Sequence, residues 1–189
     1  PVFHGANQGV AQTRVDALGR VRCGYVTYVD GDDQFLPDKL EREAALLDER
    51  TEVGIAFSNH YYVASDGRRR LWHEAGHGEM PRGNVFPAVY GRDFPGRQVF
   101  RMEMVRYREW KRIGFHRTDL PLYEDFEMRL RLTAVLQADY MDGPAAVIHD
   151  ERQGLSDRPW SEHIECLGCI MRKHKKPPPG VSPAELADA

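Results

Sequence analysis

Three carboxylates, Asp30, Asp32 and Asp33, lie within four residues directly after the β-rich run 24–29. Such side chains repel one another unless a cation lies between them, and hard divalent cations prefer carboxylate oxygens. In an open α/β sheet, ligands bind beyond the carboxyl ends of the strands. An acidic turn between a strand and a helix has the same composition, because Asp and Gly are common turn residues. The cluster alone therefore fits both a ligand site and an ordinary turn.

A second acidic pair, Glu124 and Asp125, lies where the pattern predicts the start of another helix. A carboxylate in this position can take the proton of a hydroxyl group that attacks a substrate. Carboxylates at a helix N-terminus are also ordinary, because the helix dipole favours anions there. The residues by themselves leave both interpretations open.

The order of several short motifs is more specific than any one of them. Over about residues 5–157 the chain resembles glycosyltransferase family 2, the inverting enzymes of the GT-A fold. The motifs that carry the resemblance are Asn7-Gln8-Gly9, a helix containing Arg14, the strand that ends in Asp30-Gly31-Asp32-Asp33, the helix start Pro37-Asp38-Lys39-Leu40, Ile113-Gly114-Phe115, and Glu124-Asp125 followed by Leu130-Arg131-Leu132.

The resemblance implies a sugar transfer from a nucleotide-diphosphate donor to an acceptor hydroxyl with inversion. It implies that Asp32 binds a divalent ion, Mn²⁺ or Mg²⁺, which bridges the donor diphosphate, and that Asp30 faces the donor sugar or ribose. An ion there would stabilise the charge that develops on the leaving diphosphate. Asp125 is the expected general base, with Glu124 beside it, and which of the two takes the proton stays open.

Three further residues receive a role from the resemblance. Asn7 and Arg14 are expected to contact the nucleotide or its phosphates, and His149 is expected near the metal or diphosphate as a metal ligand. Imidazole suits Mn²⁺, whereas Mg²⁺ prefers oxygen. The structural alternatives are a turn asparagine, an exposed helix arginine and a histidine at a strand end.

Two departures from the family pattern stand out. The family begins with a strand, a helix and a second strand that hold the nucleotide base, and such a unit needs about 30 residues. Only six residues precede Asn7, so we expect a chain that lacks this N-terminal nucleotide-binding portion. In addition, Val15 follows Arg14 where the family often has Asn.

The fold class expected is α/β of the GT-A type, with a mixed, mainly parallel sheet flanked by helices. We expect a GT-A domain over residues 1–157, a C-terminal amphipathic helix over 158–176 and a Pro-rich tail over 177–189. The predicted helices span 10–20, 37–48, 124–136 and 159–174, and the predicted strands span 24–29, 53–62, 99–105 and 145–148. Ser65-Asp66-Gly67 predicts a hairpin turn, and 68–98 reads as an irregular region that shapes the acceptor side in the family.

Helical periodicity also predicts which side chains are buried. In the helix 10–20 the apolar face leaves Arg14 outside it, and in the helix 124–136 Arg129 and Arg131 are expected to point outward. The expected buried residues are Ala11, Val15 and Leu18 in the first helix, Phe126, Leu130 and Ala134 in the third, and Trp160, Ile164, Leu167 and Met171 in the last.

Composition restricts the partners and the compartment. Of 189 residues, 26 are Lys or Arg and 29 are Asp or Glu, so the net charge of −3 gives no case for a nucleic-acid partner. Three cysteines do not form a secreted disulfide framework, and no apolar run reaches the ~18 residues of a membrane span. We therefore expect a cytoplasmic protein without a transmembrane segment. The resemblance implies a carbohydrate or lipid-linked acceptor and a role in cell-surface polysaccharide biosynthesis, and it leaves peripheral membrane association open.

Three other interpretations compete with an active glycosyltransferase. A degenerate GT-A-like module that binds a sugar nucleotide without turnover would carry the same motifs. His73 and His77 match a zinc-peptidase spacing, but Gly76, Gly78 and Pro81 break the helix which that site needs. The pair Cys166 and Cys169 with His174 resembles part of a zinc site, although buried thiols explain it better.

Overall fold

The structure is a computed structural model that describes residues 4–74, 76–95, 98–149, 158–176 and 178. Its described strands form one six-stranded sheet in the order β1-β5-β3-β6-β2, with β4 paired to the outer half of β3. The strands are β1 (Tyr25–Val26), β2 (Gln34–Phe35), β3 (Val53–Val63), β4 (Arg69–Leu71), β5 (Met104–Arg106) and β6 (Gln137–His149).

The central pair of strands, β3 and β6, runs parallel from the Val53–Gln137 pair to the Val63–His149 pair. The four other pairings are short and antiparallel. Residues 53–60 of β3 are all buried, as expected for a strand that is covered on both faces. The expected α/β class with a mixed sheet is confirmed, and the longest ladder is the parallel one.

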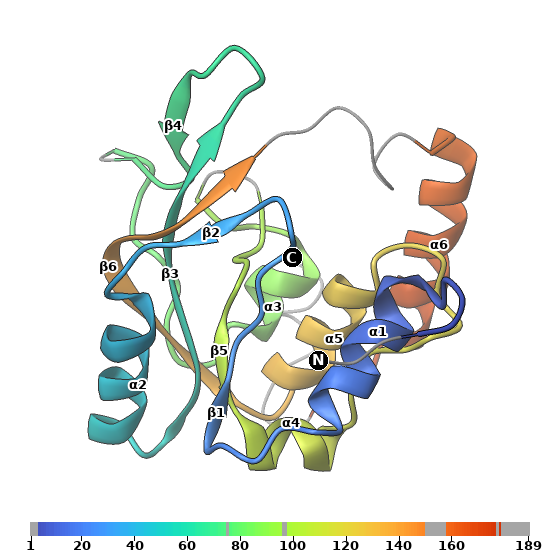
Figure 1. Cartoon of the computed structure of the whole chain (residues 1–189), viewed down its shortest axis with the longest axis horizontal. Helices are drawn as coiled ribbons and strands as arrows, with labels where there is room; N and C mark the ends of the chain where they lie inside the picture. The colour runs from blue at the N-terminus through green and yellow to red at the C-terminus, as the bar shows by residue number, and fades with distance from the viewer. Residues whose placement is uncertain (1–3, 75, 96–97, 150–157, 177, 179–189) are drawn as a thin grey trace.

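Helices cover both faces of this sheet (Figure 1). The helix α2 (Lys39–Glu49) packs on one face against β3 and β6, while the remaining helices lie on the other face. Those helices are α1 (Gly9–Leu18), α3 (Phe86–Tyr90), α4 (Tyr107–Ile113), α5 (Glu124–Thr133) and α6 (Trp160–Lys173).

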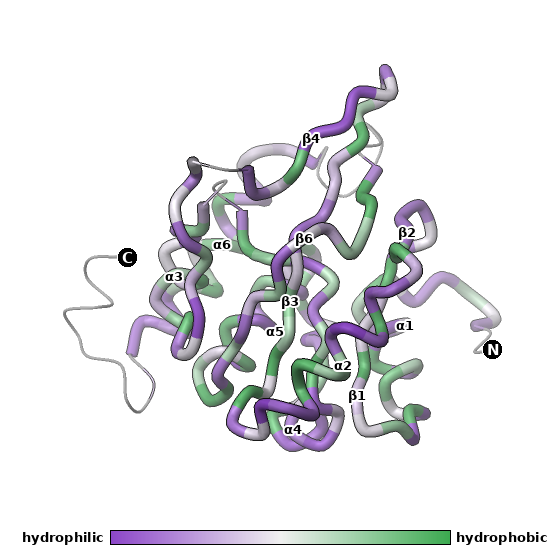
Figure 2. The backbone as a smooth tube through the Cα atoms, turned by 90° about the vertical axis from the view of Figure 1, so that its left-hand side faces the viewer, coloured by the Kyte–Doolittle hydropathy of each residue, from purple (hydrophilic) through white to green (hydrophobic). Residues whose placement is uncertain are grey.

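The apolar side chains form two clusters, one on each face of the sheet. Alternation along β3 directs Ile55 and Phe57 into the larger cluster and Ala56 into the smaller cluster under α2. The larger cluster includes Trp72, Trp110 and residues of α5 and α6. Figure 2 shows apolar colour along the central strands and polar colour at the tip of the β3–β4 hairpin.

The expected burial pattern of α5 is wrong for Arg129. Its side chain is 5% exposed, and it forms ion pairs with Asp125 in the same helix and with Glu103, which is fully buried. Because α5 is surrounded by other elements on almost every side, a charged residue in it is buried with its partners. Arg131 is partly buried, and it donates to the backbone carbonyls of residues 113–115.

The helix expected over 159–174 is confirmed as α6, but the face it buries is different. Trp160 and Ile164 are 80% and 69% exposed. The buried residues are His163, Cys166 and Ile170, with Leu167 and Met171 packed partly against the core. The helix is rotated relative to the predicted orientation, so that the face with His163 and Cys166 contacts the core. The hydrophobicity of the residues alone does not predict this orientation.

Other element boundaries differ from the sequence pattern as well. The expected strand 99–105 begins later, as β5, and residues 107–113 form the helix α4, which the pattern did not predict. The expected strand 145–148 is the end of the 13-residue β6, and the expected strand 24–29 is reduced to β1. The β3–β4 hairpin with its 65–67 turn is confirmed. Of the expected tail 177–189, only residue 178 is described, so that prediction lies almost wholly outside the described residues.

Candidate active site

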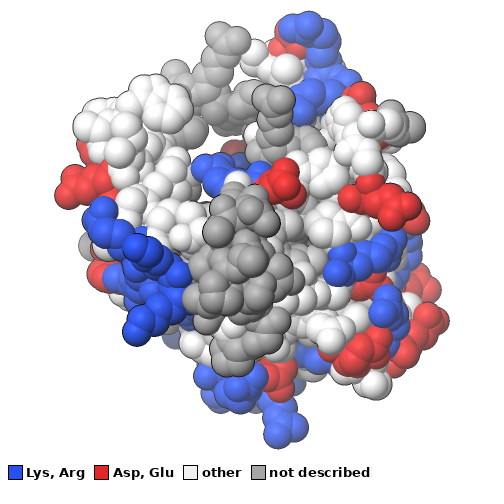
Figure 3. All heavy atoms as spheres, turned by 180° about the vertical axis from the view of Figure 1, so that it is seen from behind, with Lys and Arg blue, Asp and Glu red and all other residues white. Residues whose placement is uncertain are grey.

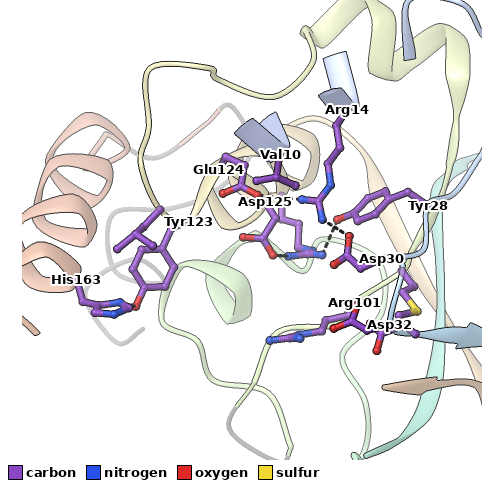
Figure 4. A pocket seen from close by; sticks show the side chains of 14 residues that line it. Val10, Arg14, Tyr28, Asp30, Asp32, Arg101, Tyr123, Glu124, Asp125 and His163 are labelled. Carbon is purple, nitrogen blue, oxygen red and sulfur yellow. Dashed lines mark hydrogen bonds and ion pairs between the residues drawn. The ribbon is translucent and has the colours of Figure 1, made fainter. Parts of the chain in front are cut away.

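A cavity of about 390 Å³ lies between the segment after β1 and the N-terminus of α5 (Figure 4). It brings together both acidic groups that the sequence singles out. Its lining residues are Val10, Arg14, Tyr28, Asp30, Asp32, Asp33, Arg101, Met102, Leu122, Tyr123, Glu124, Asp125, Arg129 and His163. In Figure 4, Asp30, Asp32 and Arg101 lie on one side of the cavity, Tyr123 and His163 lie on the opposite side, and Glu124 and Asp125 lie between them.

Local structure explains how α5 presents its carboxylates. Tyr123 precedes the helix with φ of 61°, a left-handed conformation that is uncommon for a residue other than glycine. The chain then enters α5, so Glu124 and Asp125 lie in its first turn, where the helix dipole stabilises anions. The hydroxyl of Tyr123 lies 2.9 Å from Nδ1 of His163 in α6, and this contact links the turn to α6.

Arg14 connects the two acidic groups across the cavity. Its Nη2 lies 2.6 Å from Oδ1 of Asp30, and its Nη1 lies 2.9 Å from Oε1 of Glu124. Its guanidinium also stacks 4.6 Å from the ring centre of Tyr28. Arg14, which the sequence pattern places off the apolar face of its helix, has a largely buried side chain that lines the cavity, and a phosphate entering the cavity would meet this guanidinium.

Asp125 is held by a buried arginine. Arg129 donates from Nη1 to its Oδ2 at 2.7 Å, and the backbone N–H of Phe126 donates to its Oδ1 at 2.7 Å. Burial raises the pKa of Asp125, but the positive charge of Arg129 outweighs this and holds the pKa well below its usual range. Asp125 is therefore ionised at neutral pH, as a proton acceptor must be.

Glu124 lies in a different environment from its neighbour. Its side chain is 9% exposed, compared with 34% for Asp125. Burial, together with the nearby charge of Asp125, raises the pKa of Glu124. Asp125 is therefore the more accessible of the two carboxylates, and Glu124 is the more basic.

The acidic cluster after β1 provides oxygen ligands for a cation. Burial raises the pKa of Asp33, and the neighbouring charges of Asp32 and Asp30 add to the rise. The carboxylate of Asp33 accepts a hydrogen bond from the backbone N–H of His149 at 2.9 Å, which leaves Asp30 and Asp32 as the carboxylates nearest to a ligand. Mg²⁺ and Mn²⁺ are commonly held by one or two carboxylates together with substrate phosphates, so this donor set fits such an ion.

His149 lies beside Asp32, where the sequence places it. Its Nδ1 is 2.7 Å from the backbone carbonyl oxygen of Asp32, and because a carbonyl only accepts, Nδ1 carries the proton. The Nε2 lone pair is then available, which is the arrangement of many metal-binding histidines. Within the described ranges, no three side chains of His, Cys, Asp or Glu form a ready-made metal cage.

His149 and the remaining sequence candidates are not among the residues that line the cavity. Oδ1 of Asn7 accepts the backbone N–H of Gly9 at 2.8 Å, so in this structure Asn7 closes a turn just before α1. His73 and His77 lie in a turn region with no described helix, as expected from its glycines. Cys166 is buried and Cys169 is exposed, and His174 contacts Glu127 instead of either thiol.

Five polar residues of the cavity were missed by sequence reasoning, namely Tyr28, Arg101, Tyr123, Arg129 and His163. The spacing of Arg129 four residues after Asp125 signals an ion pair on one helix face, and could have identified it. Arg101, Tyr123 and His163 come from a loop, a turn and a distant helix, so no local pattern marks them.

Comparison with known proteins gives separate evidence on the family and the fold of the chain. The model of the family described as "Glycosyl transferase family 2" matches residues 1–118. A putative teichuronic acid biosynthesis glycosyltransferase, TuaG of Bacillus subtilis (strain 168), is 35% identical over 66 residues, which make up 35% of this chain and 26% of that protein.

Solved structures show the same fold. A crystal structure of S. aureus TarS 1–349 superposes with a TM-score of 0.69 at 15% identity, over 98% of this chain and 51% of that one. TarS 1–349 in complex with UDP-GlcNAc gives a TM-score of 0.70 at 17% identity, over 96% of this chain and 52% of that one. The chain thus spans about half of those structures and about a quarter of TuaG. Because the family model covers more than half of the chain, the chain belongs to glycosyl transferase family 2.

Proposed function

We propose that this chain transfers a sugar from a nucleoside-diphosphate donor to an acceptor hydroxyl with inversion, assisted by Mn²⁺ or Mg²⁺. The observation that carries the proposal is the convergence of Asp30 and Asp32 with Glu124 and Asp125 in one cavity. An inverting transfer needs a group that stabilises the leaving diphosphate and, on the other side of the anomeric carbon, a base for the acceptor proton. In Figure 4, Asp30 and Asp32 lie on one side of the cavity and the two carboxylates of α5 lie nearer its middle, so each acidic group can serve one of these two tasks.

At the donor end, Asp32 would hold the ion, and Asp30 would contact the donor sugar or ribose. When bound, the ion would neutralise the charge that develops on the diphosphate. Arg14 would give up its pairing with Asp30 to contact a phosphate, and His149 would ligate the ion or orient the loop that carries Asp32. Asn7, just before α1, would contact the nucleotide or its phosphates. The TarS complex with UDP-GlcNAc supports a uridine nucleotide as the first donor to test.

At the acceptor end, we assign the base to Asp125. Glu124 is the stronger base, because its pKa is raised. A base must first reach the proton, however, so the position of the carboxylate matters before its basicity. Asp125 has the more accessible carboxylate. Each of its oxygens keeps a second acceptor position after the bonds from Arg129 and Phe126.

The acceptor is a carbohydrate or a lipid-linked carbohydrate in this proposal, and the pathway is cell-surface polysaccharide biosynthesis, as the name of TuaG suggests. No helix in the described part of the chain is long and apolar enough to cross a bilayer.

Calorimetric titration of the chain with UDP and with GDP, in the presence and absence of Mn²⁺, tests the donor site. We expect metal-dependent binding that is lost in Asp32→Ala and kept in Glu41→Ala, which removes an exposed carboxylate of α2. Binding that does not depend on the metal, or that survives Asp32→Ala, would contradict the assignment of Asp32. The absence of binding to either nucleotide would contradict a working donor site in this chain.

A further inference from the structure

The β3–β4 hairpin extends from the body of the protein and carries three consecutive arginines, Arg68, Arg69 and Arg70 (Figure 1). All three are exposed. Figure 3 shows basic side chains gathered at the upper right, where the hairpin lies in that view. Because the whole chain has a net charge of −3, this basic patch is a local feature of the hairpin.

The register of the hairpin separates these arginines between its two faces. Arg70 pairs with Tyr62, and the carbonyl of Arg68 accepts the N–H of Ala64. Side chains alternate along a strand, so Arg68 and Arg70 share the face of Tyr62, while Arg69 stacks 4.3 Å from the ring centre of Tyr61. The three arginines together with Tyr62 and Ala64 line a hollow of about 400 Å³.

The guanidinium groups on the Tyr62 face are held in place before any ligand binds. That of Arg70 lies 4.4 Å from the ring centre of Tyr62, and Nε of Arg68 lies 2.6 Å from a carboxylate oxygen of Asp66. Stacking on an aromatic face leaves the N–H edge of a guanidinium free to bind an anion. Groups that are already ordered lose less conformational entropy when a ligand binds.

Tyr62 connects this face to the segment that precedes the cavity residue Arg101. Tyr62 is mostly buried, and its hydroxyl contacts the side chain of Gln98, three residues before the cavity residue Arg101. Burial raises the pKa of Tyr62, and the positive charges of Arg101 and Arg70 both oppose the rise. Tyr62 thus contacts both Arg70 of the hairpin and Gln98, on the segment that leads to the cavity residue Arg101.

We propose that Arg68, Arg70 and Arg101 bind an acceptor polymer with repeated anionic groups, carboxylates or phosphates, and guide its end to the cavity. This proposal rests on the proposed function, because it describes the acceptor of that reaction. A ligand that contacts the hairpin hollow and the cavity together must be an extended chain. Guanidinium groups bind carboxylates and phosphates alike, so the structure selects repeated negative charge and leaves the choice between the two to experiment.

The test measures binding of the full chain to fluorescent oligogalacturonate, a polycarboxylate, and to fluorescent polyphosphate, with neutral dextran as a control polymer. The test variant is Arg68→Gln/Arg70→Gln. The control variant is Arg108→Gln/Lys111→Gln, which removes two exposed charges from α4 at the opposite end of the sheet. Thermal unfolding and UDP binding check that each variant is folded.

We expect at least one anionic polymer to bind, and we expect the hairpin variant to weaken its binding roughly tenfold, because each exposed charge-assisted contact contributes about threefold. Arg70→Gln alone, which leaves the Arg68–Asp66 pair intact, should show part of this loss. The control variant should bind like the wild type, and added salt should weaken binding.

Equal binding by the hairpin and control variants would overturn the proposal, as would no binding of either anionic polymer. Binding to phosphatidylglycerol vesicles without binding to the polymers would also overturn it, and would assign the arginines to a membrane surface. If UDP fails to bind while polymer binding depends on Arg68 and Arg70, the proposed donor site fails and the anion-binding face remains.

Discussion

Nη1 of Arg129 lies 2.7 Å from Oδ2 of Asp125, one helical turn away within α5. The same guanidinium extends to Glu103, where Nε lies 3.0 Å from Oε1, and it donates to the hydroxyl of Tyr28 at 2.9 Å. The arginine therefore balances two carboxylates and fixes the orientation of the proposed base. Its surroundings make it a positioning residue for Asp125.

Replacing Arg129 should change the pH dependence of the protein. In Arg129→Gln the charge that lowers the pKa of Asp125 is gone, so this pKa should rise toward or above its ordinary value of 3.8. Asp125 would then become protonated at a higher pH, and the acid-side loss of transferase activity should move to higher pH. Rate measurements from pH 4 to 8 test this. The control is Arg131→Gln, which removes contacts to Glu127 and to backbone carbonyls but none to Asp125. An unchanged acid limb in Arg129→Gln would contradict the role of the pair.

The same substitution has a consequence for stability. A carboxylate whose pKa is depressed in the folded state contributes stability above its unfolded-state pKa, and this is lost as the pH falls toward the folded-state pKa. For Asp125 the wild type should therefore lose free energy of unfolding as the pH falls below 3.8. Arg129→Gln should lose less over that range, as urea unfolding at several pH values would show. A parallel pH dependence in the two proteins would contradict the ion pair.

The division of roles between the two carboxylates of α5 can be tested by neutral isosteres. Asp125→Asn should leave UDP affinity within about twofold and reduce transfer by about 100-fold or more, because general base catalysis contributes about 10²–10⁴-fold. Glu124→Gln should have a smaller effect on turnover and a larger one on donor affinity, since Glu124 pairs with Arg14. Donor titration and initial rates on both variants separate the two effects. The reverse pattern would make Glu124 the base.

A buried ion pair in α2 supports the fold, and Nζ of Lys39 also donates to the backbone carbonyl of the cavity residue Met102 at 2.7 Å. Nζ of Lys39 lies 2.6 Å from both carboxylate oxygens of Glu43, and neither side chain is more than 2% exposed. Burial lowers the pKa of Lys39 and raises that of Glu43, so each group depends on the other to stay charged. Lys39→Met should lower the free energy of unfolding by about 3–5 kcal/mol, because it leaves a carboxylate buried without its cation.

The matched control for Lys39→Met lies in the same helix. Arg42 and Asp38 form a pair with the same spacing of four residues, but both are partly exposed. Arg42→Met should lower the free energy of unfolding by less than about 1 kcal/mol. Equal destabilisation by the two substitutions in urea unfolding would contradict the importance of burial.

The sequence by itself determined the kind of fold and marked the two acidic segments that meet in the candidate active site. Two acidic groups nearly a hundred residues apart, the helix around Arg14 and the hairpin turn at 65–67 were readable because each depends on local features. Turn residues and helix periodicity act over a few residues, and the order of the motifs is read along the chain, so no distant contact is needed to recognise them.

The tertiary structure decided which of these residues meet and which polar groups are buried. Arg129 points inward because Glu103 and Tyr28, far away in the sequence, provide its partners. Trp160 and Ile164 remain exposed because α6 packs through His163, Cys166 and Ile170. Arg101 and His163 enter the cavity from separate elements. The polarity of a side chain sets the cost of burying it, but only the arrangement of its neighbours decides whether that cost is offset.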